Sequence, residues 1–299
     1  RRRQACQSRS RRHSGMIPVY RPELAEFLET VYRVCGRSLR LDRDPLAIVR
    51  RYEDAADREI AALICSTLAF GSVDLIMRAC DQALAPLGPR PADSLLQMDE
   101  KTIAKTWARF QYRFCFPKDM IGLMRGARGA LREHGSLQSL FAASDNPQKP
   151  LTDALSAFVT ALRQYSIPAA GRTGQALGAS PASIRPNLLP DPAQGSACKR
   201  LFLFLRWMVR RDDVDPGGWD SVSPARLVVP MDTHMAATCA HRLGFLDTKR
   251  AASSPNLKDA LQATAHFALY APEDPVKYDF ALTRPGIDPR PGDEIFGCL

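Results

Sequence analysis

Apolar residues recur at every third or fourth position along most of the chain. After Arg21, the residues Leu24, Phe27, Leu28 and Val31 follow this spacing, which places their side chains on one face of a helix. The same periodicity predicts further helices over 57–70, 73–84, 119–134 and 151–165. Clear alternation of apolar and polar residues, which is typical of strands, is lacking. The pattern therefore predicts an all-α protein.

Two segments depart from this regular pattern. Residues 107–116 are aromatic and basic (WARFQYRFCF), and we expect a helix or a helix followed by a loop there. Residues 166–198 are rich in Pro, Gly, Ala and Ser, which predicts a long connection. Long stretches without regular structure inside a compact domain are often functional.

The composition is that of a globular protein. Hydrophobic residues make up 45% of the 299 residues and charged residues 24%, which excludes a wholly disordered, collagenous or coiled-coil chain. A membrane span needs about 18 consecutive apolar residues, and no such run occurs, so we expect no membrane association. The eight cysteines include no pair at C-x-x-C spacing, so we expect no zinc ribbon, iron–sulfur cluster or other cofactor.

The net charge of +9 is concentrated at the start of the chain. Residues 1–15 hold six arginines and no acid, and the rest of the chain carries the remaining +3. This arm has no apolar periodicity and is expected to be disordered. Three explanations are open: a phosphate-binding arm, a transit peptide, or an upstream extension of the reading frame. We favour the last, because Met16 directly precedes the first predicted helix. The expected location is the cytoplasm, or an organelle or nucleus if the arm is a targeting segment.

A second basic concentration lies between Ser196 and Arg211. Five basic residues and no acid occur there: Lys199, Arg200, Arg206, Arg210 and Arg211. On a helix, Lys199, Arg206 and Arg210 fall on one narrow stripe. The helix follows a Pro/Gly-containing turn with Gly195 and Ser196, whose free backbone N–H groups suit a phosphate. The alternative interpretation is a solvated basic face of a core helix.

An aspartate follows an apolar segment at 227–230. Asp232 stands where a helix would begin, and Gly244 stands where it would end. Asp232 is then a helix N-cap, and the helix dipole keeps such a carboxylate ionised. An ionised carboxylate is also suited to stabilise a cationic transition state. His234 is expected to form hydrogen bonds at the start of the same helix.

Several of these segments resemble a bacterial family described only as a domain of unknown function, DUF2400. The resemblance is carried by DREIAALICSTLAFG (57–71), RFQYRF (109–114), LLPDPAQGSACK (188–199), LVVPMDTHMAATCAHRLGF (227–245) and PEDPVKYDFAL (272–282). It extends over most of the chain after about residue 40. That family in turn looks like a divergent branch of the helix–hairpin–helix DNA glycosylases. The segment VVPMDTH is similar to the Val-Pro-Val-Asp-x-His segment of 8-oxoguanine DNA glycosylases.

The resemblance implies roles for individual residues. It places Asp232 in the catalytic position and Lys199 in the position of the lysine nucleophile. It also implies that Gly195, Ser196, Arg200, Arg206, Arg210 and His234 contact DNA. The chain departs from the glycosylase pattern in two ways. The usual hairpin has two glycines where only Gly195 is present, and an extra segment, 210–224, lies between Lys199 and Asp232.

The resemblance further implies a fold and an activity. We expect residues 16–299 to form one helix–hairpin–helix glycosylase-like domain, with two helical lobes around a cleft. The expected activity is a monomeric DNA repair glycosylase that removes a damaged base, such as an oxidised purine, from duplex DNA. With Lys199 as nucleophile, the enzyme would also have lyase activity. With water as nucleophile, it would be monofunctional. The resemblance to a bacterial family further implies that the protein acts close to the nucleoid.

Two other classes of function stay open. One is a DNA- or RNA-binding protein that keeps the fold without catalysis, and the other is a scaffold in which Asp232 is only a cap. A joint catalytic role requires Lys199 and Asp232 to face the same cleft.

Overall fold

The computed structural model describes residues 17–167, 184–251 and 254–298. Within these residues the chain forms helices and turns with three isolated backbone bridges and no strand, which confirms the all-α prediction. The first half contains α1 (Pro22–Cys35), α2 (Leu46–Val49), α3 (Ala55–Leu68), α4 (Val73–Leu84), α5 (Pro91–Gln97), α6 (Glu100–Thr106), α7 (Pro117–His134), α8 (Leu137–Ala142) and α9 (Leu151–Tyr165). The second half contains α11 (Lys199–Val209), α12 (Thr233–Ala237), α13 (Thr248–Ala251), α14 (Leu257–Phe267) and α15 (Asp279–Ile287).

The helices predicted from periodicity are present, with small changes at their ends. The bounds of α4 and α9 coincide with the predicted ones, and α3 ends two residues before the predicted Phe70. Gly135 follows α7 with a φ of 80°, a left-handed conformation that glycine adopts without strain. The arm at 1–15 and residues 168–183 of the 166–198 connection lie outside the described residues.

The aromatic segment 107–116 is a turn, so its interpretation as a helix is wrong. Tyr112 and Cys115 exchange backbone hydrogen bonds of 2.9 and 2.7 Å, and Arg113 between them has a φ of 49°. Pro117 then begins α7 and disfavours helical backbone at Phe116 before it. Phe110 and Tyr112 are buried, but they lie in a turn and not on the apolar face of a helix.

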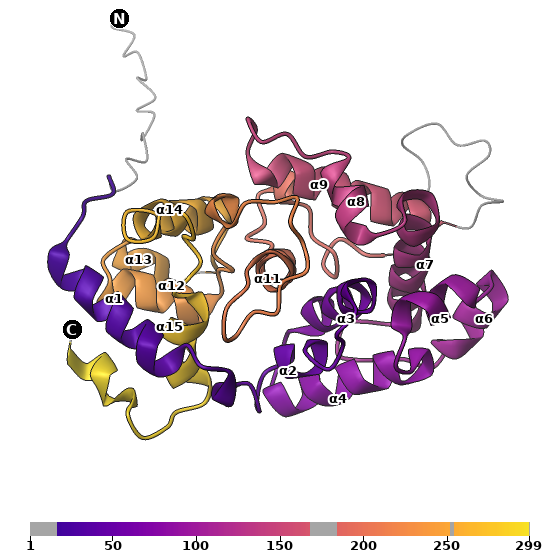
Figure 1. The fold of residues 1–299 in the computed structure, drawn as a ribbon, viewed down its shortest axis with the longest axis horizontal. Coiled ribbons are helices and arrows are strands. Elements are labelled where there is room, and N and C mark those ends of the chain that lie inside the picture. Colours follow the sequence, from indigo (N-terminus) through magenta and orange to yellow (C-terminus); the bar gives the residue numbers. More distant parts are fainter. Residues whose placement is uncertain (1–16, 168–183, 252–253, 299) are drawn as a thin grey trace, which may run out of the picture.

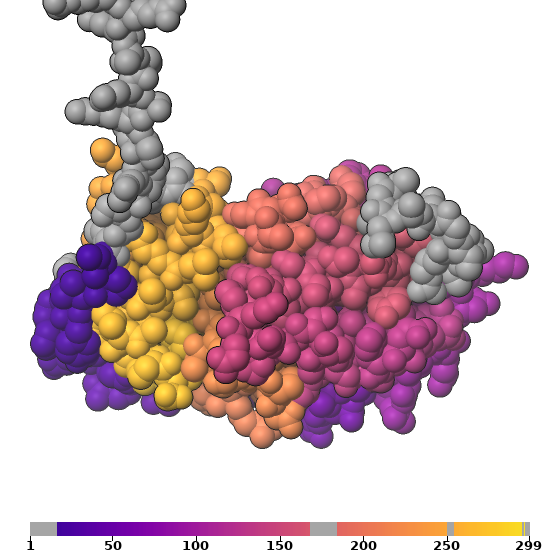
Figure 2. Space-filling model, turned by 90° about the horizontal axis from the view of Figure 1, so that it is seen from above, coloured from indigo at the N-terminus to yellow at the C-terminus, as the bar shows by residue number. Residues whose placement is uncertain are grey.

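Figure 1 shows two groups of helices on either side of α11. One group contains α1 and α12–α15, and the other contains α2–α9. From above, the yellow C-terminal part and the magenta middle part of the chain form one continuous surface (Figure 2). Helix α11 packs against α3 and buries Leu201, Phe202, Phe204 and Leu205. It is therefore a central element on which residues from both groups converge.

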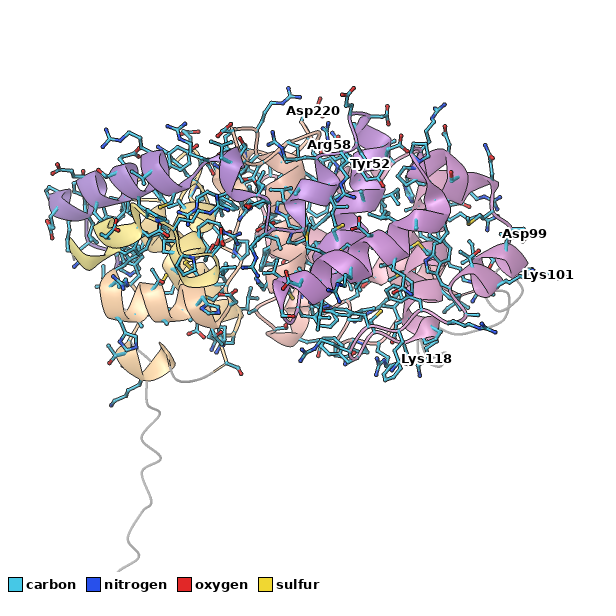
Figure 3. The ribbon with its side chains drawn as sticks, turned by 90° about the horizontal axis from the view of Figure 1, so that it is seen from below. Tyr52, Arg58, Asp99, Lys101, Lys118 and Asp220 are labelled. Atoms are coloured by element: carbon cyan, nitrogen blue, oxygen red, sulfur yellow. The ribbon has the colours of Figure 1, made fainter. Side chains whose placement is uncertain are left out.

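The extra segment after α11 folds back against α11 and α3. The backbone N–H groups of Gly217 and Trp219 donate to carbonyls of α11, and Arg58 of α3 donates to the Gly217 carbonyl at 2.9 Å. The Trp219 ring is buried against Phe204, and its Nε1 donates to Glu59 at 2.6 Å. Figure 3 shows Arg58 and Asp220 on the same side of the molecule. Trp219 is thus part of the hydrophobic core.

None of the described helices is both long and apolar enough to cross a bilayer.

Candidate functional site

Lys199 and Asp232 meet at the junction of two helix starts. The Lys199 Nζ lies 3.0 Å from the Asp232 Oδ2. Lys199 is the first residue of α11, and Cys198 before it has a left-handed φ of 44°. Asp232 is the N-cap of α12, and its carboxylate accepts the Met235 N–H at 2.9 Å. Two turns that are 33 residues apart in the sequence therefore bring an amine and a carboxylate together.

The carboxylate of this pair is ionised at neutral pH. Burial alone would raise the pKa of Asp232, but the Lys199 ammonium and the Met235 N–H outweigh burial and lower this pKa below its usual value. Both side chains keep access to solvent, with exposed fractions of 33% for Lys199 and 22% for Asp232. A partly exposed ion pair can exchange its partner for a ligand, which a fully buried pair cannot do without exposing a charge.

The pair lies in the wall of a cavity of about 590 Å³. Ligand-binding cavities typically measure about 300–1,000 Å³ and have mostly apolar walls with a few polar groups. The walls come from the α3–α4 loop, α11, the start of α12 and α15. The apolar lining residues are Pro45, Ala69, Phe70, Val73, Ile76, Leu203, Pro230, Phe280 and Ile287. The charged lining residues are Arg43, Asp44, Lys199, Arg206, Asp232, Asp279 and Arg284.

An aromatic and basic layer backs the α3–α4 side of the cavity. Phe70 stacks on Phe114 with ring centroids 4.0 Å apart, and the Arg200 guanidinium lies 5.1 Å from the Phe70 ring. Tyr112 donates to the Phe70 carbonyl, which fixes the loop that follows α3. A side chain at Gly71 would meet the Tyr112 hydroxyl and the Arg113 guanidinium at about 3 Å. The position therefore requires glycine, both for this close approach and for its φ of 106°.

Gly195 and Ser196 form the exposed turn before α11. Gly195 has a φ of 77°, and its N–H donates to the Pro192 carbonyl at 2.8 Å. The Ser196 hydroxyl accepts from the Cys198 N–H at 3.3 Å. Neither residue lines the cavity of Lys199 and Asp232. Ser196 instead lines a second hollow with Arg163 and Arg200, which lies on the outer side of the turn.

Arg200 is largely buried behind the turn before α11 and connects it to α3 by hydrogen bonds. Its guanidinium donates to the Thr67 carbonyl at 2.7 Å and to the Asn187 carbonyl. Burial lowers the pKa of Arg200 to about 10. Arg200 thus links the end of α3 to the segment before the turn, and it is not placed beside Lys199 in the cavity.

Arg206 and Arg210 occupy the interior, which corrects the prediction that they contact DNA. Each is only 3% exposed. Both guanidiniums bind the fully buried Asp215, and Arg206 also binds Asp279 with a closest distance of 2.5 Å. Arg210 has two further partners, Asp212 and Asp274, both at 2.9 Å. A phosphate cannot reach guanidiniums that are buried and already paired with carboxylates.

His234 is exposed at the rim of the cavity. It also lines a smaller neighbouring hollow of about 370 Å³ with His241 and Arg242. Of the predicted site residues, the structure brings together Lys199, Asp232 and His234, with Arg206 behind them. Ser196 and Arg200 instead line a separate hollow, Gly195 lies in the turn before α11, and Arg210 lies in the core.

Sequence reasoning missed the α15 side of the cavity. Phe280, Asp279 and Arg284 lie on α15, within or just after the PEDPVKYDFAL segment, to which the sequence analysis assigned no chemical role. A signal was present, because a segment with five basic residues and no acid needs carboxylates from elsewhere once it is buried. Asp215, Asp274 and Asp279 supply them. Among the described residues, no group of three or more His, Cys, Asp or Glu side chains is placed to hold a metal ion.

The family model of DUF2400, described as a protein of unknown function, matches residues 44–288. The chain belongs to this family. No curated protein and no solved structure matches the chain. The DUF2400 region contains Lys199, Asp232 and all the cavity-lining residues except Arg43, which immediately precedes it.

Proposed function

We propose that the chain is a DNA glycosylase that breaks the N-glycosidic bond of a base extruded into the cavity beside Lys199 and Asp232. The observation that carries the proposal is the 3.0 Å contact between these two side chains in the wall of a cavity large enough for a nucleobase. A joint catalytic role requires Lys199 and Asp232 to face the same cleft, and this contact meets that requirement. Enzymes that act on a base in duplex DNA must extrude it into such a pocket.

The proposed role of Asp232 is electrostatic. As the bond between C1′ and the base breaks, positive charge develops on the deoxyribose, and a fixed carboxylate beside it stabilises that charge. The lowered pKa of Asp232 keeps the carboxylate ionised at the pH of the cell. Its N-cap hydrogen bond to Met235 holds it in place.

The proposed role of Lys199 is to attack C1′. After loss of a proton, its amine forms the new C1′–N bond while the electron pair of the glycosidic bond leaves with the base, which takes up a proton from water. Ring opening then gives a Schiff base between Lys199 and the sugar, from which β-elimination cleaves the strand. If water attacks instead, the products are the free base and an intact abasic site.

The turn before α11 and the cavity rim supply the proposed backbone contacts. At the turn before α11, the Ser196 N–H is the proposed phosphate donor. Gly195 allows the nucleic-acid backbone to approach closely, although its own N–H is bound to the Pro192 carbonyl, and His234 lies at the rim. Arg200 supports the turn from below through the Asn187 carbonyl. Arg206 and Arg210 take no part in this contact.

Binding to an abasic analogue tests the proposal without knowledge of the lesion. One duplex carries a cationic pyrrolidine in place of the deoxyribose, and a second carries neutral tetrahydrofuran. We expect the protein to bind the pyrrolidine duplex at least about 100-fold more tightly, because it resembles the cationic transition state. The Asp232→Asn variant should lose this preference, since asparagine keeps the N-cap and the volume but not the charge.

The same experiment separates the alternatives. Equal affinity for both duplexes, unchanged by Asp232→Asn, would contradict the glycosylase proposal and support a non-catalytic DNA-binding protein. Tighter binding to single-stranded RNA than to either duplex would favour the RNA-binding alternative. Binding to none of them would leave the scaffold interpretation.

A further inference from the structure

The cavity that contains the proposed catalytic pair adjoins a second hollow of about 370 Å³, which we call the basic hollow. His234, Thr283 and Gly286 line both of them, so the two spaces meet along these residues. The other walls of the basic hollow come from α12, from the π-helical turn η5 (Thr238–Arg242), from α15 and from Phe296.

The basic hollow has basic side chains in its wall and no carboxylate. The basic side chains are those of His234, His241 and Arg242, and each is exposed. No Asp or Glu of the described residues lines it. Four other hollows of the described chain, including the cavity of the proposed catalytic pair, each have at least one carboxylate in their walls. Because a carboxylate repels an anion, the basic hollow suits an anionic ligand better than these four do.

Arg242 is fixed in the wall and keeps hydrogen-bond donors for a ligand. Its Nη1 donates to the Phe296 carbonyl, and the guanidinium lies 5.6 Å from the centroid of the Phe296 ring. An arginine side chain has five N–H donors, so this bond leaves donors for a bound anion. Guanidinium groups commonly bind phosphate oxygens through two parallel N–H groups.

His241 and Arg242 reach the basic hollow from an irregular turn of helix. The Leu243 N–H donates to the Thr238 carbonyl five residues earlier, at 3.1 Å, which makes the turn π-helical. Single π-helical turns are rare and frequently occur at functional sites. Thr238 lines the same hollow, and a threonine hydroxyl can also donate to an anion. The turn thus gathers three polar side chains at one wall.

We propose that the basic hollow binds one phosphate of the DNA strand that carries the extruded nucleotide, with Arg242 and His241 as its main ligands. The inference rests on the proposed glycosylase function. That function places the sugar beside Asp232, and His234, two residues later, lies where the cavity and the basic hollow meet. A phosphate attached to that sugar lies at the same border. We expect the turn before α11 to hold a different phosphate, because its hollow shares no lining residue with the basic hollow.

Neutral backbone linkages test this contact. The pyrrolidine duplex is prepared with a methylphosphonate, which lacks the phosphate charge, at the linkage on either side of the pyrrolidine, one linkage at a time. We expect at least one of the two substitutions to weaken binding of the wild type about tenfold, because a charge-assisted contact is lost. In Arg242→Gln, the substitution at that linkage should weaken binding by no more than about twofold, since the contact is already absent.

Arg132→Gln provides a matched control. Arg132 is an exposed arginine that lines a hollow with Lys101 of α6, at the far end of the group of helices that does not contain α12 (Figure 1). Both substitutions remove one positive charge, so an effect of net charge alone is the same in the two variants. Arg132→Gln should keep the full loss at the neutral linkage. His241→Gln should reduce that loss while it leaves the bond between Arg242 and Phe296 in place.

The outcomes distinguish this inference from the function on which it rests. If the Asp232-dependent preference for the pyrrolidine duplex is present but neither neutral linkage weakens binding of the wild type, the phosphate contact is overturned and the proposed function stands. A loss that is as large in Arg242→Gln and His241→Gln as in the wild type also overturns the contact. If the pyrrolidine preference itself is absent, both proposals fail together. His241→Gln, which replaces an exposed side chain, decides the matter if Arg242→Gln does not fold.

Discussion

The two ends of α11 carry the same kind of side chain in opposite environments. At its start, Lys199 is one-third exposed and has a single carboxylate partner, Asp232. About two and three turns further along the same stripe come Arg206 and Arg210, which are almost fully buried and are bound by four carboxylates. The Lys199 end presents a partly exposed ammonium to the cavity. At the other end, Arg206 reaches the cavity wall only as a buried, paired group, and Arg206 and Arg210 join α11 to α15 and to the segment after α11.

This difference shows that residue type alone does not identify a binding surface. Burial of a guanidinium costs several kcal/mol unless carboxylates compensate for it, and the dense pairing of Arg206 and Arg210 does so. An ammonium at the border of a cavity keeps its hydration and needs only one partner. The basic stripe therefore divides into an end at the cavity, which is the proposed reactive end, and a structural end, and we expect substitutions at the two ends to have different effects.

The largest expected effect is at the structural end. Asp215→Ala removes the carboxylate shared by Arg206 and Arg210 and leaves two buried guanidiniums undercompensated. We expect the free energy of unfolding to fall by about 3–5 kcal/mol, measured by urea denaturation. Asp81→Ala, which breaks an exposed pair with Arg51, should change it by less than about 1 kcal/mol. Equal effects of the two variants would remove the distinction between the ends of α11.

The next effect is on catalysis at the reactive end. Asp232→Asn should slow base release by about 100- to 1,000-fold, because the carboxylate no longer stabilises the developing cation. The stability should change little, since asparagine caps a helix as well as aspartate does. Single-turnover base release and urea denaturation of the same preparation measure both quantities. Loss of activity that merely follows loss of folded protein would contradict the assignment.

Lys199→Ala should abolish formation of the covalent adduct with DNA and leave the free energy of unfolding nearly unchanged. The pair with Asp232 is partly exposed, so we expect the free energy of unfolding to change by no more than about 1 kcal/mol. Borohydride trapping on abasic duplex DNA should give a covalent adduct with the wild type and none with Lys199→Ala. An adduct that persists in this variant would assign the nucleophile elsewhere, and its absence in the wild type would indicate attack by water.

The smallest effect is the pH dependence of the Lys199–Asp232 pair. The pKa of Asp232 is lower in the folded chain than its unfolded value of about 3.9. The pair therefore contributes its full stability above about pH 4, and this contribution is lost as the pH falls through the folded pKa. The difference in unfolding free energy between wild type and Asp232→Asn, on the order of 1 kcal/mol at pH 7, should shrink at pH 3. A difference that is constant with pH would contradict the ion pair.

Local signals in the sequence predicted much of the fold and the reactive end of the site. Helices such as α4 and α9 follow from apolar periodicity, and Asp232 was recognised as a cap because helix starts have local requirements. The partners of Arg206 and Arg210 were not predictable in the same way. Asp274 and Asp279 lie more than 60 residues away, and such pairing leaves no periodic pattern in either segment.

The turn at 107–116 and the α15 wall of the cavity escaped prediction for the same physical reason. A buried aromatic residue has the same appearance in sequence whether a helix or a turn presents it, and Tyr112 is presented by a turn. Arg284 and Asp44 are 240 residues apart and meet only when α15 closes the cavity. Tertiary packing decides both features, whereas periodicity records only local structure.

The most direct test of the central proposal is release of a free base from DNA. Duplexes that each contain one modified base are incubated with excess protein, and the liberated base is identified by mass spectrometry. We predict release of at least one modified base, at a rate that falls about 100-fold or more in Asp232→Asn. Absence of release from every duplex, or equal rates for wild type and Asp232→Asn, would contradict the proposal that Lys199 and Asp232 form the site of glycosidic bond cleavage.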